Sequence, residues 1–222
     1  MSQTSLAFPL SVRPAHLPPF ATRIAAWQAR HGRHHLPWQS DDPYRVWLSE
    51  IMLQQTQVAT VLDYYPRFLA RFPDVAALAA ASADDVLACW SGLGYYSRAR
   101  NLHQAAQQVM DIFGGRFPAD RAALETLRGV GRSTAAAIAV FAYGHKEAIL
   151  DGNVKRILAR HAGIYGAPDR PATQQALWAA AEARLPDDAA TLRRYTQGLM
   201  DLGSAICMRS RPQCGACPVA AN

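Results

Sequence analysis

The sequence predicts an all-α protein. Apolar residues recur at helical spacing almost everywhere past residue 20, and no alternating apolar and polar run is flanked by hairpin turns. Prolines separate the segments, at positions 43, 73, 118, 168 and 186. No tandem repeat, low-complexity tract or long linker interrupts the pattern. We therefore expect helices joined by short loops.

The chain is basic and long enough for one large domain or two small ones. Its 222 residues carry 23 Lys and Arg against 17 Asp and Glu, a formal net charge of +6, and half of them are apolar. This composition excludes disorder for most of the chain, and no stretch reaches the ~20 apolar residues of a membrane-spanning helix. We predict a cytosolic protein without a membrane partner, whose flexible N-terminal tail covers residues 1–19. The charge favours nucleic acid as a partner, although a solvated basic surface is its more common cause.

The first segment that contains candidate catalytic residues is the expected helix YRVWLSEIMLQQTQV at residues 44–58. Glu50 shares a helical stripe with Val46 and Leu53, so its carboxylate lies among apolar neighbours. Desolvation there would raise its pKa and allow it to act as a general acid near neutral pH. The alternative is an ordinary surface glutamate paired with an arginine. The polar residues 54–56 that follow offer amide and hydroxyl groups to nucleic-acid bases.

Two further helices are expected between residues 82 and 115. Ser82, followed by Asp84 and Asp85, is a typical N-cap pattern. The run from about Tyr95 to Phe113 carries one apolar face and stops at the glycine pair 114–115. The chain in this region is therefore expected to be helical with sharply defined ends.

A glycine pattern, LRGVGRSTAAAIAVFAYG, occupies residues 127–144. Two glycines one residue apart allow a tight turn whose backbone N–H groups point outward at a helix start, where the helix dipole also favours an anion. The pattern is typical of the helix-hairpin-helix element, which holds a DNA backbone phosphate without reading sequence. A plain helix–turn–helix corner, in which the glycines only permit close packing, is an equal alternative.

The segment ILDGNVKR, residues 149–156, places Asp151 and Asn153 at the start of an expected helix. Both residue types are good N-caps, which is the purely structural interpretation. A second carboxylate beside Glu50 would suit cleavage of a glycosidic bond, because an anion stabilises the oxocarbenium-like centre. The sequence alone does not bring the two acids together.

Three of the four cysteines lie close together near the end of the sequence. Cys207, Cys214 and Cys217 form a C-x6-C-x2-C pattern, which indicates an iron–sulfur cluster or zinc and not a disulfide framework. Cys89 lies far from them and is expected to be a core residue.

These motifs together resemble the MutY family of adenine-specific mismatch DNA glycosylases, in the helix-hairpin-helix, endonuclease III-like superfamily. The resemblance runs through LPW at 36–38, PYRVWLSEIMLQQTQVATV at 43–61, GLGYYSRARNLH at 92–103, GVGRSTAAAI at 129–138, ILDGNVKR at 149–156 and MDLGSAIC at 200–207. It implies a two-lobed fold. A six-helix lobe would span residues 36–146, and residues 20–35 with 147–222 would form the second lobe.

The resemblance implies a function in base excision repair, the removal of adenine mispaired with 8-oxoguanine or guanine in double-stranded DNA. Glu50 corresponds to the acid that protonates adenine at N7, Asp151 to the carboxylate that stabilises the oxocarbenium ion, and Asn153 to the residue that supports it. The remaining correspondences are Trp38, Ser133 and Gln197 in the adenine pocket, Gln55 and Tyr95 as residues inserted into the duplex, and Leu127, Gly129, Gly131 and Lys155 at backbone phosphates. Further phosphate contacts are expected from Arg98, Arg100 and Arg132.

Ser133 occupies a position that discriminates within the superfamily. In the related lyase-active glycosylases for oxidised pyrimidines, a lysine at this position attacks the sugar. Serine lacks that amine, so we expect water as the nucleophile and a monofunctional glycosylase. Lys155, near Asp151, could still trap an abasic product slowly. An endonuclease III-like glycosylase for oxidised pyrimidines is the alternative function.

The resemblance also implies a 4Fe-4S cluster held by Cys207, Cys214, Cys217 and a fourth cysteine, which would fall directly after Asn222. Because the sequence stops there, we expect the cluster to be incomplete, absent or held by another ligand. The family's C-terminal domain for 8-oxoguanine recognition is likewise not in this sequence, so we expect weak adenine excision with a reduced preference for 8-oxoguanine over guanine.

The resemblance finally implies a monomer in the bacterial cytoplasm, associated with the nucleoid. Two other classes of function remain open. A pure DNA-binding module would need no carboxylate at Glu50, and a zinc-stabilised interaction domain would rest on the clustered cysteines alone.

Overall fold

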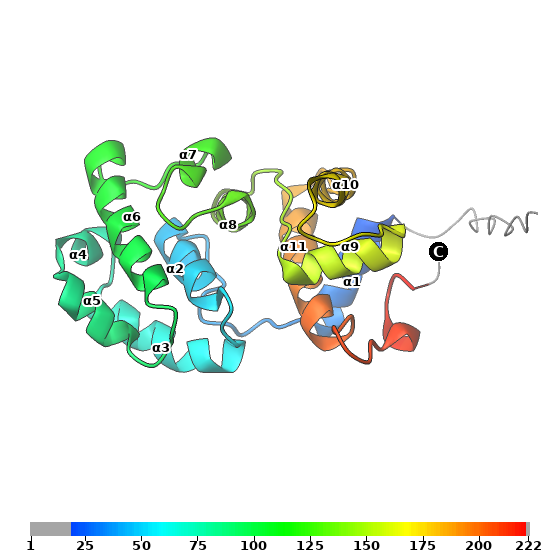
Figure 1. Cartoon of the computed structure of the whole chain (residues 1–222), viewed down its shortest axis with the longest axis horizontal. Coiled ribbons are helices and arrows are strands. Elements are labelled where there is room, and N and C mark those ends of the chain that lie inside the picture. Colours follow the sequence, from blue (N-terminus) through cyan, green and yellow to red (C-terminus); the bar gives the residue numbers. More distant parts are fainter. Residues whose placement is uncertain (1–18, 221–222) are drawn as a thin grey trace, which may run out of the picture.

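The computed structural model describes residues 19–220, and every regular element in that range is a helix (Figure 1), as predicted. The predicted tail, residues 1–19, lies outside the described residues except for Pro19. The α-helices are α1 (Phe20–His31), α2 (Pro43–Leu53), α3 (Val58–Arg71), α4 (Val75–Ala80), α5 (Ala83–Trp90), α6 (Ser97–Phe113), α7 (Arg121–Glu125), α8 (Arg132–Ile138), α9 (Gly152–Ala162), α10 (Pro171–Glu182) and α11 (Ala189–Ala205). A π-helix η1 (Ala139–Tyr143) continues α8, and a 3-10 turn η2 (Cys214–Ala216) lies in the cysteine segment.

Local sequence signals account for the helix ends. The Asp42 carboxylate accepts hydrogen bonds from the backbone at the start of α2, and Ser82 does the same at α5. Helix α6 ends at Gly114, whose φ of 60° suits glycine. This helix begins at Ser97, two residues later than expected, because Tyr95 has a left-handed backbone with φ 47° and cannot be part of it.

Buried apolar side chains form two clusters, which correspond to the two groups of helices in Figure 1. One cluster includes side chains from all the helices from α2 to α8. The other joins α1, at the beginning of the described chain, to α9, α10 and α11. The continuous α8–η1 segment contributes to both clusters, with Ile138 in the first and Val140 in the second. The predicted two-lobed fold is therefore confirmed, although the structure describes seven α-helices in the first lobe, α2 to α8, and not six. The lobe boundary at residue 146 stays a prediction.

Within residues 19–220, no helix combines the length and the apolar character needed to cross a lipid bilayer.

Candidate active site

A cavity of about 670 Å³ opens between the two groups of helices. Its walls come from α1, the loop that follows α1, α2, η1 and α11. Three of the predicted catalytic and base-binding residues line it, namely Trp38, Glu50 and Gln197. Its volume lies within the ~300–1,000 Å³ range of small-ligand sites, so a single flipped nucleobase could fit.

Glu50 is placed at the cavity by the apolar stripe of α2. Val46 and Leu53 line the same cavity, as the helical spacing predicts. Burial, together with the nearby charge of Asp151, raises the pKa of Glu50 from its ordinary 4.5 to about 8. At neutral pH the Glu50 carboxyl therefore carries a proton, which is the state that a general acid requires.

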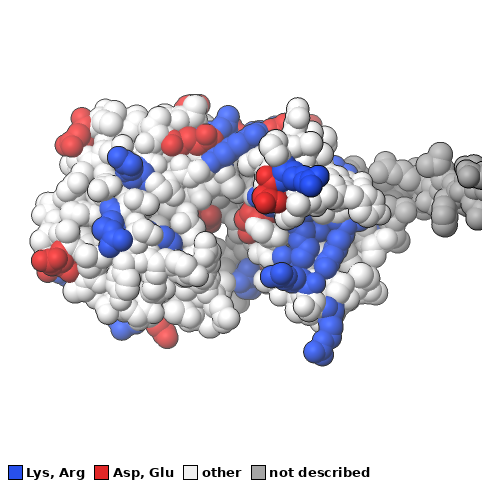
Figure 2. Space-filling view, in the orientation of Figure 1, with Lys and Arg blue, Asp and Glu red and all other residues white. Residues whose placement is uncertain are grey.

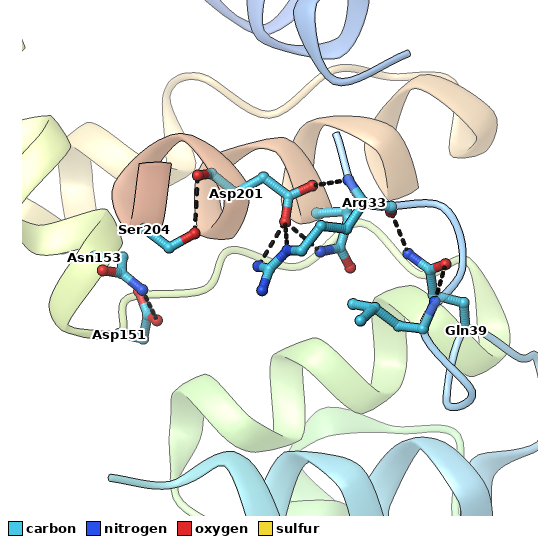
Figure 3. A network of polar contacts seen from close by, with 8 residues as sticks. Arg33, Gln39, Asp151, Asn153, Asp201 and Ser204 are labelled. Carbon is cyan, nitrogen blue, oxygen red and sulfur yellow. Dashed lines mark hydrogen bonds and ion pairs between the residues drawn. The ribbon is translucent and has the colours of Figure 1, made fainter. Parts of the chain in front are cut away.

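Asp151 is fixed at the start of α9. One carboxylate oxygen accepts a hydrogen bond from the Val154 backbone at 2.8 Å, and the other accepts one from the Asn153 amide at 3.4 Å (Figure 3). Burial raises the pKa of Asp151, and these hydrogen bonds together with Arg156 partly oppose the rise. The fold thus brings within electrostatic range two acids that are a hundred residues apart, which the sequence could not establish.

Asn153 is held in turn by two residues that the sequence analysis did not single out. Arg156 donates to the Asn153 side-chain oxygen and to the Gly203 carbonyl, each at 2.7 Å, and also to the Cys207 carbonyl at 2.6 Å. A Cβ atom at Gly203 would lie only 2.4 Å from the Asn153 Cβ, so α11 approaches α9 closely because glycine stands there. Position alone could have suggested Arg156, which follows Asn153 by three residues on α9.

A second polar network forms around Asp201, a buried acid on α11 that the sequence analysis also missed (Figure 3). Its carboxylate accepts from the Arg33 backbone at 3.0 Å, from Arg33 Nε at 2.6 Å and from the Gln197 amide at 2.9 Å. Gln39 extends the network by donating to the Arg33 carbonyl at 2.7 Å. Asp201 thereby fastens the loop after α1 to α11 and fixes the amide of Gln197 at the cavity.

The other base-contacting candidates lie apart from the cavity. The Ser133 hydroxyl accepts a hydrogen bond from the Leu150 backbone at 2.9 Å and so links α8 to the loop that leads to Asp151. Gln55 and Tyr95 are exposed, and both have left-handed backbones, with φ of 58° and 47°. They stand at the end of α2 and before α6, respectively.

The glycine hairpin has the expected turn between α7 and α8. Leu127 is buried, Gly129 has φ 76°, and Gly131 caps α8. A Cβ atom at Gly129 would lie 3.0 Å from the Asn101 Cβ, so both backbone freedom and close packing favour glycine there.

Basic residues are distributed unevenly over the surface. Figure 2 shows Lys and Arg side chains gathered over α9 on the visible face. Lys155 on α9 is half-buried, and Arg100 is exposed. Arg132 packs its guanidinium over the Trp178 ring at 3.7 Å and pairs with Glu182, so α10 already engages part of its charge.

The expectation that Arg98 contacts phosphate is wrong. Its side chain is buried, and both terminal nitrogens donate to acceptors inside the protein. A sequence shows that a residue is basic but not whether neighbouring carbonyl groups bind it.

The three clustered cysteines are half-buried or exposed near η2. Burial raises the pKa of Cys217, and the nearby Cys207 and Cys214 add to the rise, so the thiols influence one another. Even so, residues 19–220 contain no group of three side chains arranged to hold a metal ion. The described residues therefore do not complete a cluster site. Cys89 is half-buried against the first apolar cluster.

Residues 48–183 match the HhH-GPD superfamily of base excision DNA repair proteins. This chain belongs to that superfamily. The match includes Glu50, the glycine hairpin, Asp151 and Asn153, so the superfamily region contains both acids and the phosphate-binding candidate. Helix α1 and helix α11, which complete the cavity, lie outside the matched residues.

Comparisons with individual proteins agree with this membership. The chain is 42% identical to an adenine DNA glycosylase of Buchnera aphidicola subsp. Baizongia pistaciae over 201 residues, covering 90% of this chain and 56% of that protein. It is 34% identical to a thymine/uracil-DNA glycosylase of Pyrobaculum aerophilum, covering 91% and 89%. A solved thermostable thymine-DNA glycosylase superposes with a TM-score of 0.80 at 30% identity, covering 89% and 90%. The chain spans about half the length of the curated adenine glycosylases it matches.

Proposed function

We propose that this protein is a monofunctional DNA glycosylase that removes adenine mispaired with 8-oxoguanine or guanine, in base excision repair. The observation that carries the proposal is the Glu50 carboxyl at the cavity wall, protonated at neutral pH through burial and the neighbouring Asp151. A module that only bound DNA would gain nothing from an acid kept in that state. The adenine glycosylases that the chain resembles supply the choice of base.

In this mechanism Glu50 donates its proton to N7 of the extruded adenine, and the base leaves as a neutral molecule. The C1′–N9 bond breaks, its electrons go to the base, and the sugar becomes an oxocarbenium ion. Asp151 stabilises that cation as a carboxylate, with Asn153 holding its second oxygen. Water then attacks C1′ and loses a proton to the solvent, which gives an abasic site without strand cleavage.

The remaining residues prepare the substrate. Trp38 and Gln197 line the cavity that receives the base, and Ser133 binds the Leu150 backbone next to Asp151. Gln55 and Tyr95 enter the duplex where the adenine has left the stack. The hairpin of Leu127, Gly129 and Gly131, with Lys155, binds backbone phosphates of double-stranded DNA.

The cofactor and the cellular setting complete the proposal. For the cysteine segment we propose that Cys207, Cys214 and Cys217 would hold a 4Fe-4S cluster only together with a fourth ligand, and that the cluster is otherwise incomplete or absent. Iron and sulfide analysis of the purified chain tests this assignment, and zinc without iron would refute it. The protein would act as a monomer at the nucleoid of the bacterial cytoplasm.

The decisive experiment measures excision from a duplex with a single adenine opposite 8-oxoguanine, with and without alkali. Wild type should give strand breaks only after alkali treatment, and Glu50→Gln should give none. Strand breaks without alkali would contradict a monofunctional enzyme, and activity retained in Glu50→Gln would contradict the assigned acid. Binding of the same duplex by both proteins serves as the control for folding.

A pyrimidine glycosylase is the second candidate, because the Pyrobaculum relative that matches over most of its own length is named for thymine and uracil. Duplexes with thymine or uracil opposite guanine, and one with an oxidised pyrimidine, should be included in the same assay. Faster excision of any of these than of adenine would favour the second candidate.

A further inference from the structure

Arg98 makes an unusual set of contacts for a basic residue beside a DNA-binding surface. It is only 8% exposed, and its Nη1 donates to two carbonyls in the last turn of α2, those of Ile51 at 3.0 Å and Met52 at 2.8 Å. Its Nη2 donates to the Thr56 hydroxyl at 3.0 Å. Arg98 therefore fixes the turn that follows α2, in which Gln55 stands.

The same guanidinium fixes the loop that precedes α6. Its Nη2 also reaches the carbonyls of Leu93 and Gly94, each at 3.3 Å. The guanidinium carbon lies 5.5 Å from the centre of the Tyr95 ring and 5.3 Å from that of Trp90, within the range of cation–π contacts. One side chain thus joins two loops that are about forty residues apart in sequence.

Gln55 and Tyr95 are the strained residues of these two loops. Each is a non-glycine residue with a positive φ, a conformation that persists only where the surroundings hold it. Both side chains are nevertheless exposed, Tyr95 by 59%. Every hydrogen-bond acceptor of Arg98 lies within four residues of one or the other. The buried guanidinium of Arg98 therefore stabilises the strained backbone on which the exposed side chains of Gln55 and Tyr95 stand.

We propose that Arg98 is a positioning residue that keeps Gln55 and Tyr95 together as a preformed wedge, ready to replace the extruded nucleotide in the DNA stack. This inference rests on the proposed function. Holding the wedge in place before binding removes the cost of ordering two loops while the base is being flipped. A core that needed only volume would hold an apolar side chain at this position, since a buried charge costs free energy unless hydrogen bonds compensate, as they do at both terminal nitrogens of Arg98.

The test is a double-mutant cycle between Arg98→Lys and Tyr95→Ala, measured as single-turnover excision of adenine opposite 8-oxoguanine in a duplex. Lysine keeps the charge, but its single nitrogen cannot span both loops. Arg98→Lys should slow wild type at least tenfold, and should slow Tyr95→Ala less than threefold, because the residue to be positioned is already missing. With the adenine in an unpaired bubble, where flipping is easy, the loss caused by Arg98→Lys should also fall below threefold.

Tyr44→Phe is the matched control, because it removes a buried hydrogen bond to the Phe72 carbonyl in the same group of helices. A structural defect of that kind should change excision by the same small factor with and without Tyr95. If Arg98→Lys behaves in the same way, with equal losses in both backgrounds, the positioning role is wrong.

A milder variant covers the case in which Arg98→Lys does not fold. Thr56→Val removes one acceptor next to Gln55, and it should slow wild type at least threefold but leave Gln55→Ala nearly unaffected. Equal losses in both backgrounds would again overturn the inference.

The outcomes separate this inference from the proposed function. Full activity in Gln55→Ala and Tyr95→Ala would refute the wedge itself, and wild type without excision would refute the proposed activity. In the latter case, the fluorescence of 2-aminopurine at the target position still reports base flipping. Flipping by wild type and less by Arg98→Lys would support the positioning role, and no difference between them would overturn it.

Discussion

Replacing Glu50 by glutamine should remove excision and, at alkaline pH, make the protein more stable. The pKa of Glu50 is about 8 in the folded protein and 4.5 ordinarily. Between these pH values the unfolded chain releases the proton while the folded protein keeps it, so the free energy of unfolding of wild type falls as pH rises from 4.5 to 8. Glutamine has nearly the same shape and does not titrate, so the variant lacks this loss.

The size of the effect follows from that interval. At about 1.36 kcal/mol per pH unit, the difference is on the order of 5 kcal/mol. Denaturant unfolding at pH 5 and pH 9 measures it. We expect the two proteins to be nearly equal at pH 5, and Glu50→Gln to be more stable by that amount at pH 9.

A matched substitution at an exposed glutamate, Glu182→Gln, should show no such gain between pH 5 and pH 9. If Glu50→Gln is no more stable than wild type at pH 9, then the carboxyl is not held in its protonated form. The assignment of Glu50 as an acid at neutral pH would then lose its physical basis.

Other expected outcomes follow from the same site. Excision by wild type should decline about tenfold per pH unit above pH 8, where Glu50 loses its proton. Asp151→Asn should slow the reaction and move this decline to lower pH, because it removes a charge that raises the pKa of Glu50. A pH–rate profile in which the decline does not move would contradict the electrostatic link between the two acids. Gly203→Ala should slow excision at least tenfold by displacing Asn153, whereas Gly152→Ala, whose added Cβ meets no atom within 4 Å, should stay within twofold in the same assay. The logarithm of the duplex binding constant should fall linearly with the logarithm of salt concentration, with a slope of about −0.9 per phosphate contact, and a flat dependence would exclude backbone binding.

The helices could be predicted from the sequence because their signals are local. Ser82, Asp151 and Gly114 act within a few residues of the helix ends they define, and the stripe of Glu50 follows from helical spacing alone. The late start of α6 could not be foreseen, because the left-handed backbone of Tyr95 depends on contacts with distant segments.

The site was predictable in its residue types but not in its connections. Glu50 and Asp151 could be suspected separately, whereas their proximity is a property of the fold. Arg98 was misjudged because its carbonyl partners become available only where two loops meet, and Asp201 was missed because an acid on a helix gives no sign that the loop after α1 will bind it. Such contacts between distant segments are set by packing, which a single sequence does not display.

The packing of α1 against α11 has a consequence for how the protein is made. The cavity draws its walls from both helices, which are separated by more than 150 residues of chain. During synthesis, the first group of helices can form while α11 is still inside the ribosome. A nascent chain would thus be able to hold DNA through its hairpin before it could accept a base, so base excision would become available only after α11 (Ala189–Ala205) had left the ribosome.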